Sequence, residues 1–129
     1  MRLKDYLDEI LNTIAKHPFV VSQSITFEER PPDTVFITGS LTFTNGSKLY
    51  FKEFVVFKTA GFKILKYGYN YLTHDGAMIF RYDNALDPQA KKMSTYPEHK
   101  HTPKELLSAK RPSFEEVLKE IALMIEVKE

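Results

Sequence analysis

The chain has 129 residues, with 18 Lys and Arg against 17 Asp and Glu, four His and no Cys. This length favours a single domain over residues 1–129 that buries a core without cross-links. The lack of Cys excludes disulfides, thiolate nucleophiles and Cys-based zinc sites. A net charge of +1 argues against a protein that coats nucleic acid. No apolar run is long enough to span a membrane and the first residues lack a signal-peptide core, so we expect a cytoplasmic protein without membrane contact.

Residues 2–16 are predicted to form a helix, because apolar residues recur there at spacings of three and four. These residues are Leu3, Tyr6, Leu7, Ile10, Leu11 and Ile14. Pro18 cannot continue a helix and biases His17 toward an extended backbone, so the helix should end near Lys16.

An antiparallel meander of five strands is predicted to follow. The expected strands are residues 19–27, 35–44, 49–57, 62–73 and 77–82. Apolar and polar residues alternate between Val35 and Thr44, which is typical of a half-buried strand. Asn45-Gly46 and Asp75-Gly76 are strong hairpin signals, because both positions of each tolerate a positive φ.

Two-residue hairpin loops would fix the pairing of these strands. Across the first hairpin, Leu41 would face Tyr50 and Ile37 would face Phe54. Across the second, the expected pairs are Tyr71 with Phe80 and Tyr69 with Tyr82. Three tyrosines, Tyr67, Tyr69 and Tyr71, share one face, where packing within the sheet is favoured over stacking on bases.

Residues 85–112 lack a sustained period and are predicted to form a long loop. A connection of this length is functional or disordered in most compact domains. Thr102-Pro103-Lys104-Glu105 fits the start of one short helix within it. A final helix is expected over residues 113–127, where Ser113 and Glu116 fit a capping box.

The predicted fold is therefore an α+β domain: a five-strand antiparallel meander flanked by N- and C-terminal amphipathic helices, with a long loop before the last helix. Both helices are expected to cover one face of the sheet and to leave the other face partly open. An open face of this kind suits a ligand or a partner.

Two short polar motifs carry the residues with chemical potential. The first is Arg81-Tyr82-Asp83-Asn84 at the end of the fifth strand, and the second is Pro97-Glu98-His99-Lys100-His101 in the loop. His99 and His101 point the same way if the backbone is extended, so one imidazole could accept a proton while the other donates one. Lys100 or Arg81 could stabilise charge on a phosphate, and Asp83 could orient a histidine or act as a base.

This set would suit metal-independent RNA cleavage by attack of the 2′-hydroxyl. Three alternatives stay open. The two histidines could simply be solvated in a surface loop, and Arg81 and Asp83 could form a structural ion pair. Asp83, His99 and His101 could instead bind a metal ion as two imidazoles and a carboxylate, although no His-Glu-x-x-His helix supports that site.

Charge is unevenly distributed along the second half of the chain. Residues 85–112 hold six basic and three acidic residues, a net charge of +3, whereas residues 113–129 hold two basic and five acidic residues, a net charge of −3. The near-neutral total therefore conceals a basic segment around the histidines, which favours a phosphate-bearing ligand there.

The motifs together resemble the TumE family of small prokaryotic proteins. The resemblance spans residues 67–121 and rests on Tyr69-x-Tyr71 and on the segments 76–85, 97–101 and 112–118. The chain differs from the family at Leu86-Asp87-Pro88, where a Pro-His-His-like stretch is expected, and at Glu98, where another His is usual.

This resemblance implies a toxin of a type II toxin–antitoxin module with an antitoxin protein as partner and RNA as a candidate target. Carried over to this chain, the catalytic set is Arg81, Tyr82, Asp83, His99, Lys100 and His101, with Asn84 in the same polar motif. No cofactor is expected, and the sequence leaves the oligomeric state open. A non-catalytic protein-binding module and a metal-dependent hydrolase are the alternative functions.

Overall fold

The computed structural model describes residues 3–128, and the side chains of residues 3–127. An N-terminal helix, α1 (Leu3–Lys16), precedes five long strands: β1 (Val20–Arg30), β2 (Thr34–Phe43), β3 (Lys48–Lys58), β4 (Gly61–Leu72) and β5 (Met78–Asp83). A short 3₁₀ turn η1 (Pro88–Ala90), two short strands β6 (His99–His101) and β7 (Leu106–Ser108), and the helix α2 (Phe114–Lys128) complete the chain. The predicted first residue of the N-terminal helix, Arg2, lies outside the described residues.

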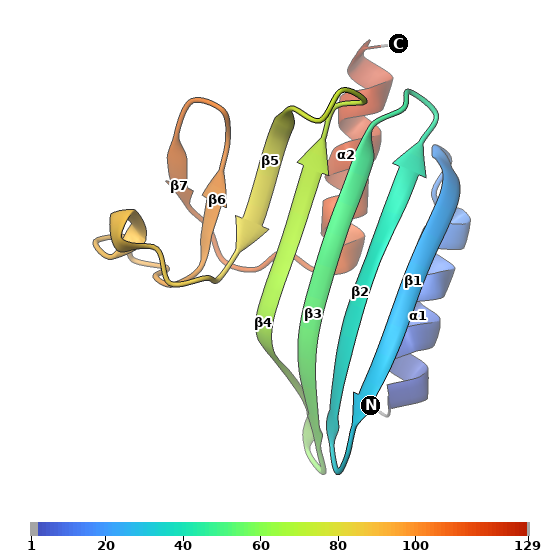
Figure 1. The fold of residues 1–129 in the computed structure, drawn as a ribbon, viewed down its shortest axis with the longest axis vertical. Helices are drawn as coiled ribbons and strands as arrows, with labels where there is room; N and C mark the ends of the chain where they lie inside the picture. The colour runs from blue at the N-terminus through green and yellow to red at the C-terminus, as the bar shows by residue number, and fades with distance from the viewer. Residues whose placement is uncertain (1–2, 129) are drawn as a thin grey trace.

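All seven strands form one antiparallel sheet in sequence order, and both helices lie behind it in the view of Figure 1. The α+β class and the terminal helices are therefore as predicted. Within residues 3–128, neither α1 nor α2 lies over the other face of the sheet, which is turned toward the reader in Figure 1. From the two polar motifs, Arg81, Asp83, His99 and His101 lie on this open face.

The expectation of five strands is wrong, because residues 85–112 contain two more. β6 and β7 have three residues each, too few to produce a recognisable period of two. The predicted short helix at Thr102 is also wrong. Thr102 Oγ1 does accept the Glu105 N–H at 3.2 Å, as in a helix cap, but Thr102 N–H also bonds the Glu105 carbonyl and closes a β6–β7 hairpin turn.

The first hairpin register is shifted by one residue from the prediction. Leu41 pairs with Leu49 and Ile37 with Glu53, because the loop after Phe43 has three residues and Phe43 bonds Ser47. Gly46 adopts φ +82° in that loop, a conformation that favours glycine. The shift places Glu53 inside the core.

The second hairpin pairs Tyr71 with Phe80 and Tyr69 with Tyr82, as predicted. Its loop also has three residues, since Thr73 N–H bonds the Ala77 carbonyl. A register shift between Tyr71 and Leu72 compensates for the longer loop.

The core lies between the sheet and the two helices. Tyr67, Tyr69 and Tyr71 are buried in it, so their predicted packing role is confirmed. The helix α2 begins with the predicted capping box, in which Ser113 N–H donates to Glu116 Oε1 at 2.9 Å and Glu116 N–H donates to Ser113 Oγ at 3.0 Å.

The buried Glu53 is satisfied from three directions. Tyr6 of α1 and Tyr69 of β4 both donate hydroxyl hydrogen bonds to its carboxylate. Arg111 donates to the Tyr69 hydroxyl at 3.0 Å and lies 3.9 Å from Glu53 Oε2. Burial raises the pKa of Glu53, and these partners oppose the shift. The cluster joins α1, the sheet and the segment that leads into α2.

Candidate active site

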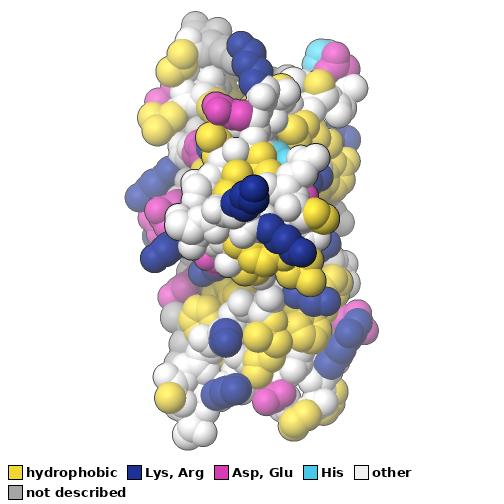
Figure 2. All heavy atoms as spheres, turned by 90° about the vertical axis from the view of Figure 1, so that its left-hand side faces the viewer, with side chains coloured by type: hydrophobic (Ala, Val, Ile, Leu, Met, Phe, Trp, Pro, Cys, Tyr) yellow, Lys and Arg dark blue, Asp and Glu magenta, His cyan; other side chains and the backbone are white. Residues whose placement is uncertain are grey.

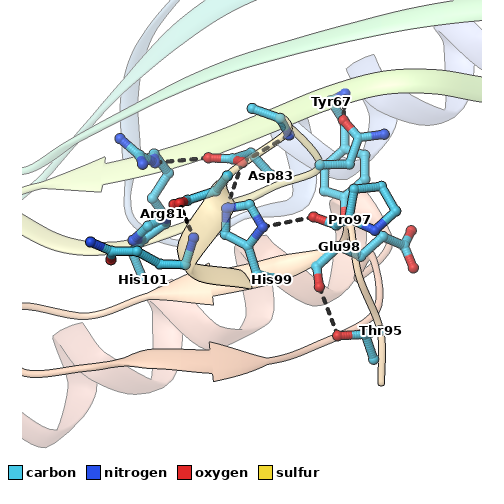
Figure 3. Close-up of polar contacts among 12 residues, drawn as sticks. Tyr67, Arg81, Asp83, Thr95, Pro97, Glu98, His99 and His101 are labelled. Carbon is cyan, nitrogen blue, oxygen red and sulfur yellow. Dashed lines mark hydrogen bonds and ion pairs between the residues drawn. The ribbon is translucent and has the colours of Figure 1, made fainter. Parts of the chain in front are cut away.

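Strand pairing brings the two polar motifs together on the open face. β5 pairs with β6 so that Asp83 faces His99 and Arg81 faces His101. Alternation along a strand sends these four side chains to one side of the sheet. Figure 3 shows them pointing toward one another.

Asp83 is the centre of a charged network. Arg81 Nε lies 2.8 Å from Asp83 Oδ2, and His99 Nε2 lies 2.9 Å from Asp83 Oδ1. The Ala85 N–H also donates to Asp83 Oδ1 at 3.1 Å. A carboxylate with this many partners is fixed in position, so Asp83 anchors the residues around it.

Both ring nitrogens of His99 have a partner. Its Nδ1 lies 2.7 Å from the Pro97 carbonyl, which can only accept, so Nδ1 carries a proton. Its Nε2 faces the Asp83 carboxylate, and only 1% of the side chain is exposed. The ring therefore connects the loop before β6 to Asp83 and presents no free nitrogen to solvent (Figure 3).

His101 differs from His99 in its partners. Its Nε2 is also buried, but it has no hydrogen-bond partner, and the nearest carboxylate oxygen, Asp87 Oδ2, is 3.8 Å away. The side chain is 19% exposed. Burial, with the nearby Arg81 guanidinium and His99 ring, lowers the pKa of His101, so its ring is neutral near pH 7.

The other two residues of the predicted catalytic set, Tyr82 and Lys100, lie on the helix side of the sheet. Lys100 Nζ donates to Glu120 of α2 at 2.8 Å, and the Tyr82 hydroxyl donates to the same carboxylate at 2.7 Å. Lys100 Nζ also lies 4.7 Å from the centre of the Tyr82 ring. These contacts dock α2 onto β5 and β6, on the face opposite His101.

Asn84, the last residue of the first motif, holds the chain after β5. Its Oδ1 accepts the Tyr67 N–H at 3.1 Å, and its Nδ2 donates to the Leu65 carbonyl at 2.9 Å. This anchor sets the path of residues 85–87, which brings Asp87 next to His101. Asp87 was not among the candidate site residues predicted from the sequence.

Three of the grouped residues also fit a metal ion. Each of Asp83, His99 and His101 offers a ligand atom, and these atoms lie within 4.8 Å of one another. Two imidazoles and a carboxylate are ligands that zinc accepts. Arg81, however, already places a positive charge against Asp83, and that charge opposes a cation.

A groove crosses the open face beside the network. Its volume is about 960 Å³, and Arg81 and Asp83 form part of its lining. Tyr50, Lys52 and Lys66 also line it. Sequence reasoning did not select these three residues. The alternation of buried and exposed residues along β3 and β4 could have placed them on the open face.

A family model described as Toxin TumE matches residues 10–128. No curated protein and no solved structure matches the chain. Within residues 3–128, no helix is both long enough and apolar enough to cross a membrane.

Proposed function

This chain belongs to the TumE toxin family, and we propose that it acts on RNA as a metal-independent endoribonuclease centred on His101. The toxin assignment follows from the family. The reaction is inferred from the residues on the open face of the sheet. An antitoxin partner follows from the toxin family, and we propose that the pair works in the cytoplasm.

The observation that carries the proposal is the contrast between the two histidines. His99 has both ring nitrogens occupied, whereas His101 keeps Nε2 without a partner and has a lowered pKa. A neutral imidazole with an unused lone pair is the group that general-base catalysis requires near pH 7. His101 therefore takes the role of base, and His99 that of a positioning residue.

The proposed reaction is attack of an RNA 2′-hydroxyl on the adjacent phosphorus. His101 removes the proton of the 2′-hydroxyl as the new P–O bond forms. The Arg81 guanidinium stabilises the negative charge that develops on the phosphoryl oxygens. The bond to the 5′ oxygen then breaks, and this oxygen takes its proton from water, because His99 is turned into the network.

In this reaction Asp83 and His99 do not contact the substrate. They position Arg81 and His101, which do. Asp83 holds Arg81 at 2.8 Å on one oxygen and His99 at 2.9 Å on the other. The rings of His99 and His101 meet edge to face, with centroids 4.7 Å apart. Burial and the nearby Arg81 guanidinium lower the pKa of His101 and so help to keep it neutral. Substrate entry would displace the Asp87 carboxylate from His101.

The test is RNA cleavage by purified protein in excess chelator. We expect cleavage by wild type and loss of cleavage in His101→Ala, whose fold should remain intact. A protein that leaves RNA intact under all conditions would refute this function and favour the non-catalytic binding module.

A metal-dependent hydrolase is the second candidate, because Asp83, His99 and His101 offer three ligand atoms and Asp87 lies beside His101. This alternative predicts that protein purified without a His tag contains a stoichiometric divalent metal. It also predicts that chelation abolishes activity and that added zinc restores it. Activity of metal-free protein in chelator would reject it.

A further inference from the structure

The sheet places the active-site residues in two rows that continue across the open face. One row runs Tyr50, Asn70, Arg81 and His101 across β3, β4, β5 and β6. The next row runs Lys52, Gly68, Asp83 and His99 across the same strands. Neighbouring strands lie about 4.8 Å apart, so each row is about 14 Å long.

From these rows we infer that the open face binds single-stranded RNA and leads it to His101. The inference deepens the proposed function, from which it takes RNA as the ligand. It assigns the groove across β3, β4 and β5 as the substrate site. Its residues Tyr50, Lys52 and Lys66 were outside the predicted catalytic set.

Charge in the groove favours a polyanion. Lys52, Lys66 and Arg81 line it, and Asp83 is the one acidic residue among its described lining residues. Asp83 is already balanced by Arg81 and His99. The helix α2 on the other face has four Glu against two Lys, so it offers this ligand no comparable cluster of positive charge.

The shape of the groove floor leaves room for a strand of nucleotides. Gly68 lies between Lys52 and Asp83, and an added Cβ at Gly68 would stand 3.3 Å from Lys52 Cε. Because Gly68 has no side chain, the aliphatic chain of Lys52 can lie close to the sheet, and the groove above it stays open. Asn70 also lines the groove, and its Oδ1 is a buried acceptor without a hydrogen-bond partner.

An aromatic surface in the groove favours a single strand over a duplex. Tyr50 is 46% exposed at the start of the row that ends at His101. Bases of a single strand can stack on such a ring, whereas bases inside a duplex are already stacked. Figure 2 shows further Lys and Arg side chains among hydrophobic ones on the side that carries β6 and β7.

The test is fluorescence anisotropy with a labelled 2′-O-methyl 12-mer of mixed sequence. This probe cannot be cleaved by 2′-hydroxyl attack, so binding is measured apart from catalysis. The variants are Lys52→Ala/Lys66→Ala, Tyr50→Ala and Tyr50→Phe. The control is Lys4→Ala/Lys16→Ala, which removes the same charge from α1. Circular dichroism checks that each variant is folded.

We expect wild type to bind and the groove double variant to lose about 1.4 from the slope of log K against log salt, about 0.7 for each phosphate contact. Tyr50→Ala should bind about 5- to 150-fold more weakly, and Tyr50→Phe should bind like wild type. The α1 double variant should keep the wild-type slope.

Three results would overturn the inference: no binding by wild type, equal losses in the groove and α1 double variants, or equal affinity for a duplex of the same sequence. Groove-dependent binding together with intact natural RNA in the cleavage assay would retain the inference and reject the proposed function. Cleavage that does not depend on the groove lysines would retain the proposed function and reject the inference.

Discussion

His99 and His101 are two residues apart on the same strand and face, yet only His101 keeps a ring nitrogen without a partner. His99 is held between the Pro97 carbonyl and Asp83, at 2.7 Å and 2.9 Å. The identical side chains are therefore expected to have different functions.

The first prediction concerns stability. Replacing His99 by Ala leaves the Pro97 carbonyl without its ring donor, and such an unsatisfied group costs about 1–3 kcal/mol. Asp83 Oδ1 loses its ring partner as well and keeps the Ala85 N–H. Urea unfolding should show a lower free energy of unfolding for His99→Ala and a much smaller change for His101→Ala. Equal losses in the two variants would contradict the division of roles.

The second prediction concerns Asp83. Asp83→Asn keeps the side-chain shape but removes the charge between Arg81 and His99. It should reduce the free energy of unfolding by about 1–3 kcal/mol, because a buried donor then loses its acceptor. Asp33→Asn is the matched control, since Asp33 is exposed in the turn before β2 and its side chain accepts a hydrogen bond from the neighbouring Thr34 hydroxyl. Equal stability of the Asp83 variant and the control would show that the network is not structural.

The third prediction concerns pH. The pKa of His101 lies below its usual 6.5 in the folded protein, since burial and the nearby positive charges disfavour the imidazolium. The base is therefore neutral above this value, and the rate of RNA cleavage should fall only when the pH drops below about 6.5.

The same shift acts on the fold. Below the unfolded pKa the unfolded chain binds the proton more readily than the folded chain, so the contribution of His101 to stability falls as the pH falls. A cleavage profile whose acid limb has its midpoint above pH 7 would contradict the assignment of His101 as the base. The profile should be measured at constant ionic strength with intact protein at every pH.

The fourth prediction separates the two faces of the sheet. Lys100 pairs with Glu120 on the helix side, so Lys100→Met should retain RNA cleavage within about threefold while it weakens the docking of α2. Hydrogen bonds to Glu120 and Tyr82 outweigh burial and raise the pKa of Lys100, so it is charged in the wild type. Loss of cleavage as complete as in His101→Ala would instead place Lys100 in the reaction.

Much of the fold could be predicted because long strands and helices repeat their patterns. The helix over α1, the capping box of α2 and the pairing of Tyr71 with Phe80 all follow from local rules. The β6–β7 hairpin could not be predicted, because three-residue strands carry no period. The pattern at residues 102–105 was also ambiguous. The Thr102 hydroxyl accepts the Glu105 N–H in this hairpin turn, and it would accept the same hydrogen bond in a helix cap.

The register of the first hairpin could not be read from Asn45-Gly46 either, because that pair fits loops of two and three residues. For the site, the shared direction of His99 and His101 follows from alternation along a strand. The same rule places Lys100 on the other face. The saturation of His99 depends on the Pro97 carbonyl and on strand pairing, which only the folded chain reveals.

The measurement that tests the central claim most directly is cleavage of a labelled single-stranded RNA in excess chelator. It compares wild type with His101→Ala and with the control His74→Ala, whose residue is exposed in the β4–β5 loop. Loss of a general base lowers the rate by about 10²–10⁴-fold, so His101→Ala should be nearly inactive while wild type and His74→Ala cleave equally. Equal cleavage by all three proteins, or cleavage that chelator abolishes and zinc restores, would contradict the account.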